Sequence, residues 1–218
     1  MEVSFITKNE WTAHNAKNLQ NRLQNLLQKC RFSPDEIAWL IADLTNRYTE
    51  KTRHYHDLTH LYNLYQSFDI HASALKNPLL IEAAIWWHDA IYDPKKKDNE
   101  QQSAALATSV FQGKTLPFQL SDLSLLIEST AAHQPQKANT DFDYFLDFDL
   151  SILAAPTDIY QQYAAAIRQE YACYPDFLYK MGRRKVLKKF LERDRIYFTP
   201  IFFEQCETQA RSNIQSEL

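Results

Sequence analysis

The chain has 218 residues, of which 45% are apolar, and a formal net charge of −3. This length suits one globular domain, and the charge gives no global attraction to nucleic acid or anionic lipid. Only two glycines occur, which argues against the glycine-rich phosphate loops of dinucleotide-binding and P-loop folds. The three cysteines are widely spaced and favour a reducing compartment. The sequence shows neither a signal-peptide pattern nor a membrane-spanning apolar run, so we expect a cytoplasmic protein.

Apolar residues recur at helical spacing through the first part of the chain. A helix is predicted within residues 10–30, where four leucines share one face. The stretch RFSPDEI supplies Ser33 as an N-cap and predicts a second helix as far as about Tyr48. We expect a third helix to begin near Asp57. A fourth follows Asn77, and its apolar residues extend nearly all the way round it, which indicates burial on most sides.

The rest of the chain continues as helical segments. They are expected over about 98–107, 121–132, 142–154, 156–173 and 183–194, and from residue 200 onward. Strand-like alternation of apolar and polar residues is nowhere sustained. We therefore predict an all-α single domain over 1–218, with about eight to ten helices. The N-terminal helices of residues 1–50 are expected to pack on a core formed by residues 51–200.

Charged residues stand inside two of the most apolar segments. His88 and Asp89 lie within IEAAIWWHDAIYD, and Asp147 and Asp149 lie within FLDFDLSIL. Burying an unpaired carboxylate is costly, so such groups are normally paired or bound to a metal. Taken singly, each has an ordinary alternative as a helix cap or a solvated side chain. Side chains two residues apart on a helix point in directions about 200° apart. Only one of Asp147 and Asp149 therefore readily faces a common centre.

Three of the seven histidines fall within RHYHDLTH, residues 53–60. His56 and His60 are four apart, which on a helix places them on one face about 6 Å apart along the axis. Two exposed histidines on an amphipathic helix would explain this stretch in isolation. Together with the charged residues inside the two apolar segments, however, this stretch gives the chain a set of two imidazoles and two carboxylates. That donor set suits Mn²⁺, Fe²⁺, Ni²⁺, Co²⁺, Zn²⁺ or Mg²⁺ and leaves two octahedral positions for water and substrate.

The order His60, His88-Asp89, Asp149 resembles the ligand pattern of the HD superfamily of metal-dependent phosphohydrolases, which are all-helical proteins. RHYHDLTH, AAIWWHDAIYD, KKDNEQQSA and FLDFDLSIL together resemble a bacterial subgroup of predicted phosphohydrolases of that superfamily. The likeness continues through IRQEY, GRRKVLKKFL and IYFT, covers most of residues 50–200, and adds little for the first 50. It implies an HD-type helical bundle in which His60, His88, Asp89 and Asp149 bind one divalent metal ion.

The resemblance bears on the number of metals and on the identity of the last ligand. HD enzymes with two metals carry further histidines between the doublet and the last aspartate, and here only His133 lies in that interval. A single metal is therefore implied. Asp149 is taken as the last ligand because an apolar helical run follows it, and Asp147 is the alternative.

The resemblance also implies a general acid. YHDLTH is similar to the YHNxxH signature of cyclic-nucleotide phosphodiesterases, in which the first histidine protonates the leaving oxygen and the second binds metal. Carried over to this chain, His56 is the general acid and His60 the ligand. Asp57 stands where that signature has asparagine.

Four further residues are candidates around this site. Asp93 would lie on the same helical face as the metal-binding doublet if the fourth helix persists that far, and it would orient the water or a ligand histidine. Glu100 matches the subgroup context, with a first-turn acid favoured by the helix dipole as the alternative. Arg53 and His133 are candidates to bind phosphate, against the alternatives of an exposed arginine and a surface histidine.

These residues predict a metal-dependent phosphohydrolase that acts on a small phosphomonoester or phosphodiester, such as a nucleotide, through metal-activated water. The alternative is a helical module that binds the metal or a nucleotide without turnover. The expected partner is a small phosphorylated substrate, with no membrane. The basic segment 183–194 is interpreted first as a solvated helix surface, which disfavours nucleic acid as a partner. The alternative is that this segment contacts a phosphate-rich substrate or nucleic acid.

Overall fold

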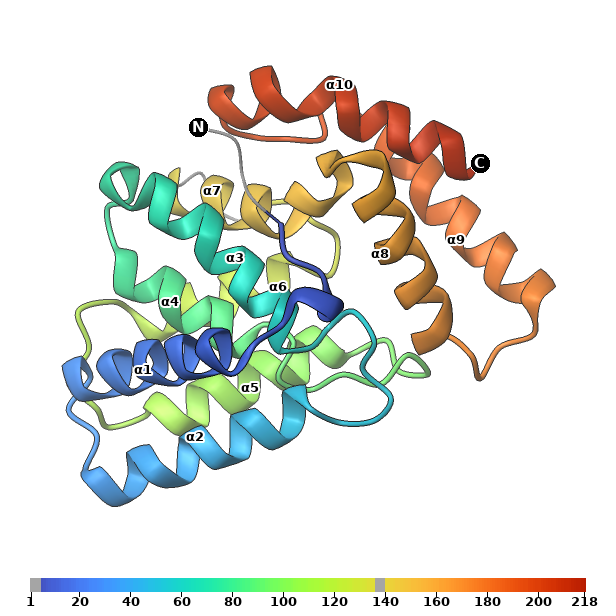
Figure 1. The fold of residues 1–218 in the computed structure, drawn as a ribbon. Helices are drawn as coiled ribbons and strands as arrows, with labels where there is room; N and C mark the ends of the chain where they lie inside the picture. Colours follow the sequence, from blue (N-terminus) through green and yellow to red (C-terminus); the bar gives the residue numbers. More distant parts are fainter. Residues whose placement is uncertain (1–4, 136–139) are drawn as a thin grey trace.

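The computed structural model describes residues 5–135 and 140–218 (Figure 1). Over these ranges the structure contains ten α-helices and three short 3-10 turns and no strand, which confirms the all-α prediction. The α-helices are α1 (Ala13–Lys29), α2 (Pro34–Tyr48), α3 (Leu58–His71), α4 (Pro78–Trp87), α5 (Asn99–Phe111), α6 (Leu120–Ser129), α7 (Thr140–Leu150), α8 (Thr157–Glu170), α9 (Asp176–Leu191) and α10 (Pro200–Glu217). The 3-10 turns are η1 (Lys8–Glu10), η2 (Ala72–Ala74) and η3 (Ser151–Ala154).

Several helices begin where a side chain can accept a hydrogen bond from the first turn. Ser33 accepts from the backbone N–H of Glu36, and the Glu36 carboxylate accepts the Ser33 N–H at 2.7 Å, which completes the predicted capping box. Asn77 and Thr199 each precede a proline and cap α4 and α10 in the same way. The helix expected from about residue 121 begins at Leu120, one residue earlier, so Ser121 lies inside α6.

The fourth helix ends earlier than its apolar pattern suggests. It stops at Trp87, and the chain from His88 onward turns away from the helical path. Arg53 donates hydrogen bonds to the backbone oxygens of Asp89 and Ala90, at 2.7 and 3.2 Å, and so satisfies carbonyls that would otherwise need helical partners. The expectation that Asp93 shares a helical face with Asp89 is therefore wrong.

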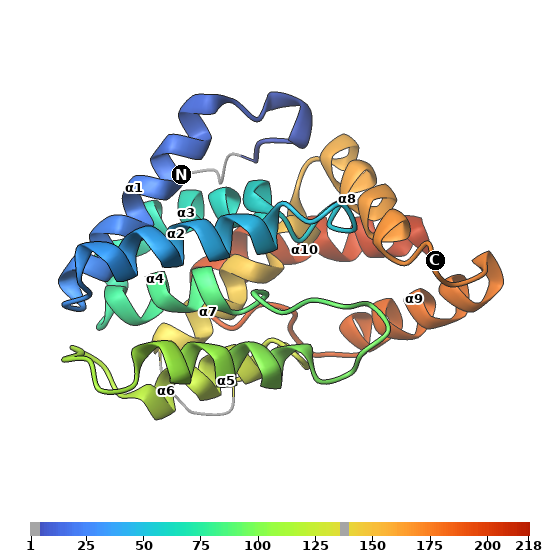
Figure 2. The ribbon, with the colours of Figure 1, turned by 90° about the horizontal axis from the view of Figure 1, so that it is seen from below.

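Helix α4 lies at the centre of the bundle. Eight of its ten residues are buried, and it packs against α1, α3, α5, α6 and α7. Figure 2 shows α5 and α6 on one side of α4 and α7, with α1 and α3 on the other. Aromatic rings fill the contacts, as where Trp87 meets Phe111 and Trp86 meets Tyr48. A helix surrounded in this way needs no polar face, which explains why its sequence is apolar apart from Glu82.

The last three helices cover one side of this bundle (Figure 1). Helix α10 packs on η3, and α9 is attached to α8 and α10 through Arg183. The Arg183 guanidinium donates to both carboxylate oxygens of Glu217, at 2.7 and 2.9 Å, and to the hydroxyl of Tyr163 at 3.2 Å. Across residues 5–135 and 140–218, no helix has the length and apolarity needed to cross a membrane.

Replacing Phe111 with alanine should destabilise the fold strongly. Its ring is fully buried between Phe32, Trp87 and Phe118, so its removal leaves a cavity and should cost about 3–5 kcal/mol of unfolding free energy. The matched control is Trp39→Ala, because Trp39 is 62% exposed and should change stability by less than about 0.5 kcal/mol. Chemical denaturation measures both, and equal losses would contradict this description of the core.

Candidate metal centre

Three segments remote in sequence meet at one point inside the bundle. His60 comes from α3, His88 caps the C-terminus of α4, and Asp149 comes from the last turn of α7. His60 Nε2 lies 3.2 Å from His88 Nε2 and 3.3 Å from Asp149 Oδ1, and His88 Nε2 lies 3.8 Å from the same oxygen. These atoms are close enough together to bind one metal ion.

Asp89 supplies a fourth donor at the edge of this group. Its Oδ2 lies 3.0 Å from His88 Nε2 and 3.8 Å from His60 Nε2. Both imidazoles are buried, while the side chains of Asp89 and Asp149 are 14% and 10% exposed, so the group is less deeply buried at its carboxylates than at its imidazoles. The structure thus brings His60, His88, Asp89 and Asp149 together.

The ring orientation of His88 is compatible with a metal ligand. His88 Nδ1 lies 3.1 Å from the backbone oxygen of Ile85, so we assign a proton to Nδ1, which leaves Nε2 to carry either a second proton or a metal ion. Nε2 lies near the ring nitrogen of His60, and the other nearby acceptors are carboxylate oxygens. Acceptor atoms gathered in this way repel one another unless a proton or a metal ion lies among them.

The charges at the site are strongly coupled. Burial lowers the pKa of His88, but the carboxylates of Asp89 and Asp149 outweigh this and raise it to about 9. Burial likewise raises the pKa of Asp89 and Asp149, and the neighbouring histidines overcome that effect and hold both pKa values below the ordinary range. Both carboxylates are therefore ionised at neutral pH, and their negative charge requires protonated imidazoles or a metal cation as a counter-charge.

His56 reaches the site by a different route from the expected one. Helix α3 begins at Leu58 with Asp57 as its N-cap, so His56 precedes the helix, and the i,i+4 prediction for His56 and His60 is wrong. The preceding loop nevertheless brings the two rings to a centroid separation of 5.8 Å. His56 Nε2 lies 4.0 Å from Asp89 Oδ2, at the more exposed side of the group.

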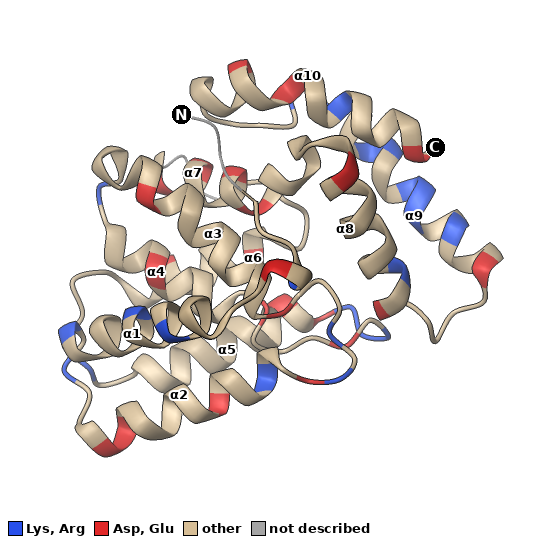
Figure 3. Cartoon of the chain, viewed as in Figure 1, with Lys and Arg blue, Asp and Glu red and all other residues tan. Residues whose placement is uncertain are grey.

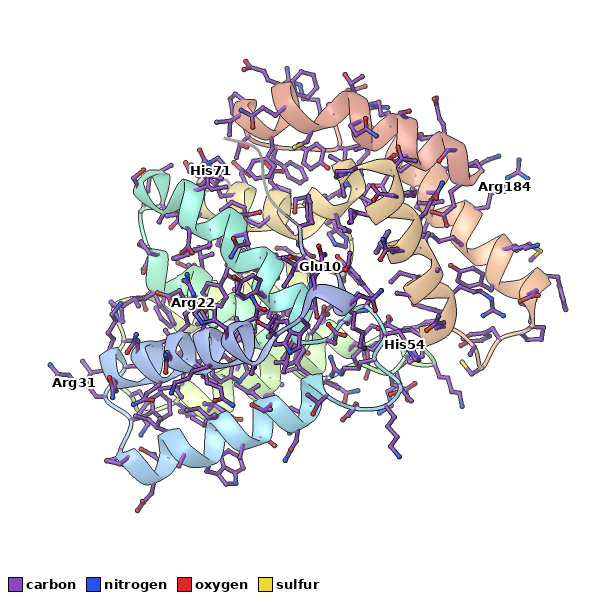
Figure 4. All side chains as sticks on the ribbon, viewed as in Figure 1. Glu10, Arg22, Arg31, His54, His71 and Arg184 are labelled. Carbon is purple, nitrogen blue, oxygen red and sulfur yellow. The ribbon has the colours of Figure 1, made fainter. Side chains whose placement is uncertain are left out.

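Glu170, at the end of α8, holds this loop in place and was not identified from the sequence. Its Oε1 accepts the backbone N–H groups of His54, Tyr55 and His56 at 2.8–2.9 Å. Its Oε2 lies 2.7 Å from His56 Nδ1 and accepts the Tyr92 hydroxyl at 2.9 Å. Figure 4 labels His54 in this loop. The available signal was the position of Glu170 on the buried face of α8, in line with the apolar residues of that helix.

Arg53 ties the same loop to the turn that carries Asp89. Its side chain is buried, and it donates to the backbone oxygens of His56 at 3.0 Å, Asp89 at 2.7 Å and Ala90 at 3.2 Å. The guanidinium also lies over the ring of Tyr48. Both of its terminal nitrogens donate to backbone carbonyls, which gives Arg53 a positioning role, and phosphate binding by Arg53 stays a prediction.

His133 lies beside the second oxygen of Asp149. Its Nε2 is 3.0 Å from Asp149 Oδ2, and its own backbone oxygen accepts a hydrogen bond from Arg193 at 2.9 Å. The residue has a positive φ of 45°, which is uncommon outside glycine and is held here by these contacts. The structure thus places His133 against a candidate ligand, and a role in substrate binding stays a prediction.

Asp93 and Glu100 lie outside the group of converging donors. The Asp93 carboxylate accepts the backbone N–H of Lys95 at 2.9 Å, and its own backbone pairs with the side chain of Asn99, so it stabilises a turn. Glu100 lies in the first turn of α5, near Tyr171, whose pKa is raised by burial and, to a smaller extent, by the charge of Glu100. A catalytic role for Asp93 or Glu100 stays a prediction.

Asp147 faces away from the metal-binding group. It accepts the backbone N–H groups of Phe198 and Thr199, both at 2.8 Å, and the Thr199 hydroxyl at 2.7 Å. Burial raises its pKa to about 7 despite these hydrogen bonds. Of the two alternatives for the last ligand, Asp149 lies in the group and Asp147 fixes the chain entering α10.

Two imidazole nitrogens and two carboxylate oxygens form a mixed donor set. Imidazole favours Zn²⁺, Fe²⁺, Co²⁺, Ni²⁺ or Mn²⁺ over the oxygen-seeking Ca²⁺. Comparison of the chain with protein-family models, with curated proteins and with solved structures finds no match. The chemistry expected of this site therefore follows from its own residues.

Asp147 and Asp149, both in α7, should respond oppositely to truncation. Asp149→Ala should remove one donor and reduce metal retention, with an intact fold. Asp147→Ala should keep the metal but lower the unfolding free energy by about 1–3 kcal/mol, because buried donors lose their acceptor. Elemental analysis after dialysis, combined with thermal unfolding, measures both. Metal lost from folded Asp147→Ala and kept by Asp149→Ala would contradict the assignment.

Metal affinity should rise with pH. The raised pKa of His88, about 9, means that without metal this imidazole holds a proton at neutral pH, and a metal ion must displace it. Apparent affinity should therefore increase by up to about tenfold per pH unit for each displaced proton between roughly pH 6 and 8. Competition with a chelator of known pH dependence measures this, and an affinity independent of pH would contradict the site.

Proposed function

We propose that the chain is a metal-dependent phosphohydrolase of the HD type, acting on a small phosphomonoester or phosphodiester such as a nucleotide. The observation that carries this proposal is the convergence of His60, His88, Asp89 and Asp149 at one point. A further imidazole, that of His56, lies 4.0 Å from the Asp89 carboxylate of the same group. The HD-like sequence contexts of these residues support the same activity.

The metal ion would be held by the two imidazoles and the two carboxylates. When bound, a divalent ion of this kind lowers the pKa of a water molecule and polarises a phosphoryl oxygen. Four protein donors leave positions free for water and for substrate in an octahedral ion. His60 and His88 are buried, so water and substrate would reach the ion past the more exposed side chains around it, those of His56, Asp89 and His133.

His56 is suited to protonate the leaving oxygen. Burial lowers its pKa, but the carboxylates of Glu170 and Asp89 overcome this and raise the pKa to about 9, so the ring is protonated at neutral pH. With Nδ1–H donated to Glu170, the proton on Nε2 is directed toward the group of donors. Glu170 thereby fixes both the orientation and the charge of the proposed general acid.

In this proposal, two further residues hold the proposed ligands and the proposed acid in position and do not contact the substrate. His133 occupies the second oxygen of Asp149 and so restricts the rotation of that carboxylate. Arg53 holds the backbone at His56 and at Asp89 in a fixed relation. The proposed acid and the proposed ligands therefore keep a constant separation.

The proposal is tested with metal-free protein loaded separately with Mn²⁺, Ni²⁺, Co²⁺ or Zn²⁺ and assayed against nucleoside monophosphates, cyclic nucleotides and short dinucleotides. At least one metal should support hydrolysis, and His88→Ala should lower kcat by at least about a hundredfold because a ligand is lost. The matched control is His14→Ala, which removes an exposed histidine from α1 and should leave turnover unchanged.

Two results would contradict the proposal. Undiminished turnover by folded His88→Ala would show that the activity does not come from this site. Tight metal or nucleotide binding without hydrolysis of any compound would instead support the binding module.

A further inference from the structure

Exposed apolar side chains gather on α9. Among the described residues, six large apolar side chains are classed as exposed, and four of them belong to this helix. Phe177 and Met181 are 65% and 66% exposed, and Leu178 and Val186 are 42% and 48% exposed. Three of the four lie in the first two turns, next to the connection from α8. Apolar side chains concentrated in this way mark a surface that meets a partner.

The same helix carries a strong positive charge. Residues 176–195 contain eight lysines and arginines and three acidic residues, a net charge of +5 within a chain of net charge −3. The rest of the chain therefore carries a net charge of −8. Figure 3 shows the basic residues following one another along α9. The exposed ones within the helix are Lys180, Arg184, Lys185, Lys188 and Lys189.

The structure fixes which face of α9 points outward. The residues that turn inward recur at helical spacing and include Arg183, Leu187 and Phe190. Arg183 is locked to Glu217 and Tyr163 by the hydrogen bonds described above, so the helix cannot rotate freely about its axis. The apolar and basic residues are consequently held on the side away from the bundle, and Arg184 extends from the body of the molecule in Figure 4.

Apolar and cationic residues share one shallow surface on this outer face. It is lined by Met181, Arg184, Lys185, Lys188, Lys189 and Glu192. Lysine and arginine side chains at such a surface can contact phosphate groups, while their alkyl stems and the methionine contact hydrocarbon. The surface therefore suits a ligand that presents negative charge and apolar groups together.

We propose that α9 docks the protein onto an anionic lipid bilayer. Phe177, Leu178 and Met181 enter the region between headgroups and acyl chains, and the basic residues of the following turns bind the phosphates of neighbouring lipids. The helix lies on the bilayer and does not cross it. The proposal is independent of the proposed catalytic activity.

The position and chemistry of this surface favour a bilayer over other anionic partners. The start of α9 projects at the edge of the molecule in Figures 1 and 2. A fluid bilayer adapts to a projecting apolar corner, whereas a folded protein would need a matching pocket. The phosphate backbone of nucleic acid would pair with the lysines but would leave Leu178 and Met181 exposed.

The test is co-sedimentation of the full chain with vesicles of phosphatidylcholine alone or mixed with phosphatidylglycerol. Binding should require the anionic lipid and weaken as salt is raised. Lys185→Glu/Lys188→Glu and Phe177→Ser/Met181→Ser should each reduce binding by at least about tenfold. The matched controls, Lys17→Glu/Lys29→Glu on α1 and Trp39→Ser on α2, should bind as the unaltered chain does, and thermal unfolding checks that all four variants fold.

Three results would overturn the proposal. The first is equal binding to neutral and anionic vesicles, or no binding to either. The second is binding to the vesicles that the α9 variants leave unchanged. The third is a concentration-dependent dimer in light scattering that Phe177→Ser/Met181→Ser abolishes, since a second copy of the chain would then cover this face.

Discussion

The arrangement around the site depends on the burial of two ionised carboxylates, Asp89 and Asp149, against two imidazoles. In a low-dielectric interior these charges are stable only with cations close to them. The raised pKa of His88 and the lowered pKa values of both aspartates express the same attraction from its two sides. A divalent metal ion satisfies all four groups at once, and the mixed imidazole and carboxylate donors suit such an ion.

Two buried residues next to the charged group, Glu170 and Arg53, hold the loops that carry it in place. Glu170 arrives from α8 and gathers the three backbone N–H groups that precede α3, together with the ring of His56. Arg53, in the same loop, donates hydrogen bonds to the backbone of the turn after α4. Glu170 thus connects a C-terminal helix to the central bundle, and Arg53 joins two connections within that bundle. Their loss would therefore loosen the site before it unfolded the core.

Local patterns predicted the helices better than they predicted the site. Caps such as Ser33 and Asn77 lie next to the turns they serve, so a single sequence reveals them. The end of α4 was missed because it depends on Arg53, more than 30 residues earlier, whose guanidinium reaches the carbonyls of the turn. Glu170 was missed for the same reason, since its partners lie 78 to 116 residues away. His88, Asp89 and Asp149 could be named because charged residues in apolar segments are conspicuous. His60 was named from the histidine-rich stretch 53–60 and from the HD-like order of the four residues.

The most direct test of this account is an anomalous-scattering map from crystals of the chain grown with Mn²⁺ or Zn²⁺ and measured at the metal absorption edge. The account predicts one strong peak among His60 Nε2, His88 Nε2, Asp89 and Asp149, with metal–ligand distances of about 2.0–2.3 Å. A map without a peak at this point, from crystals in which the four side chains keep their positions, would contradict it.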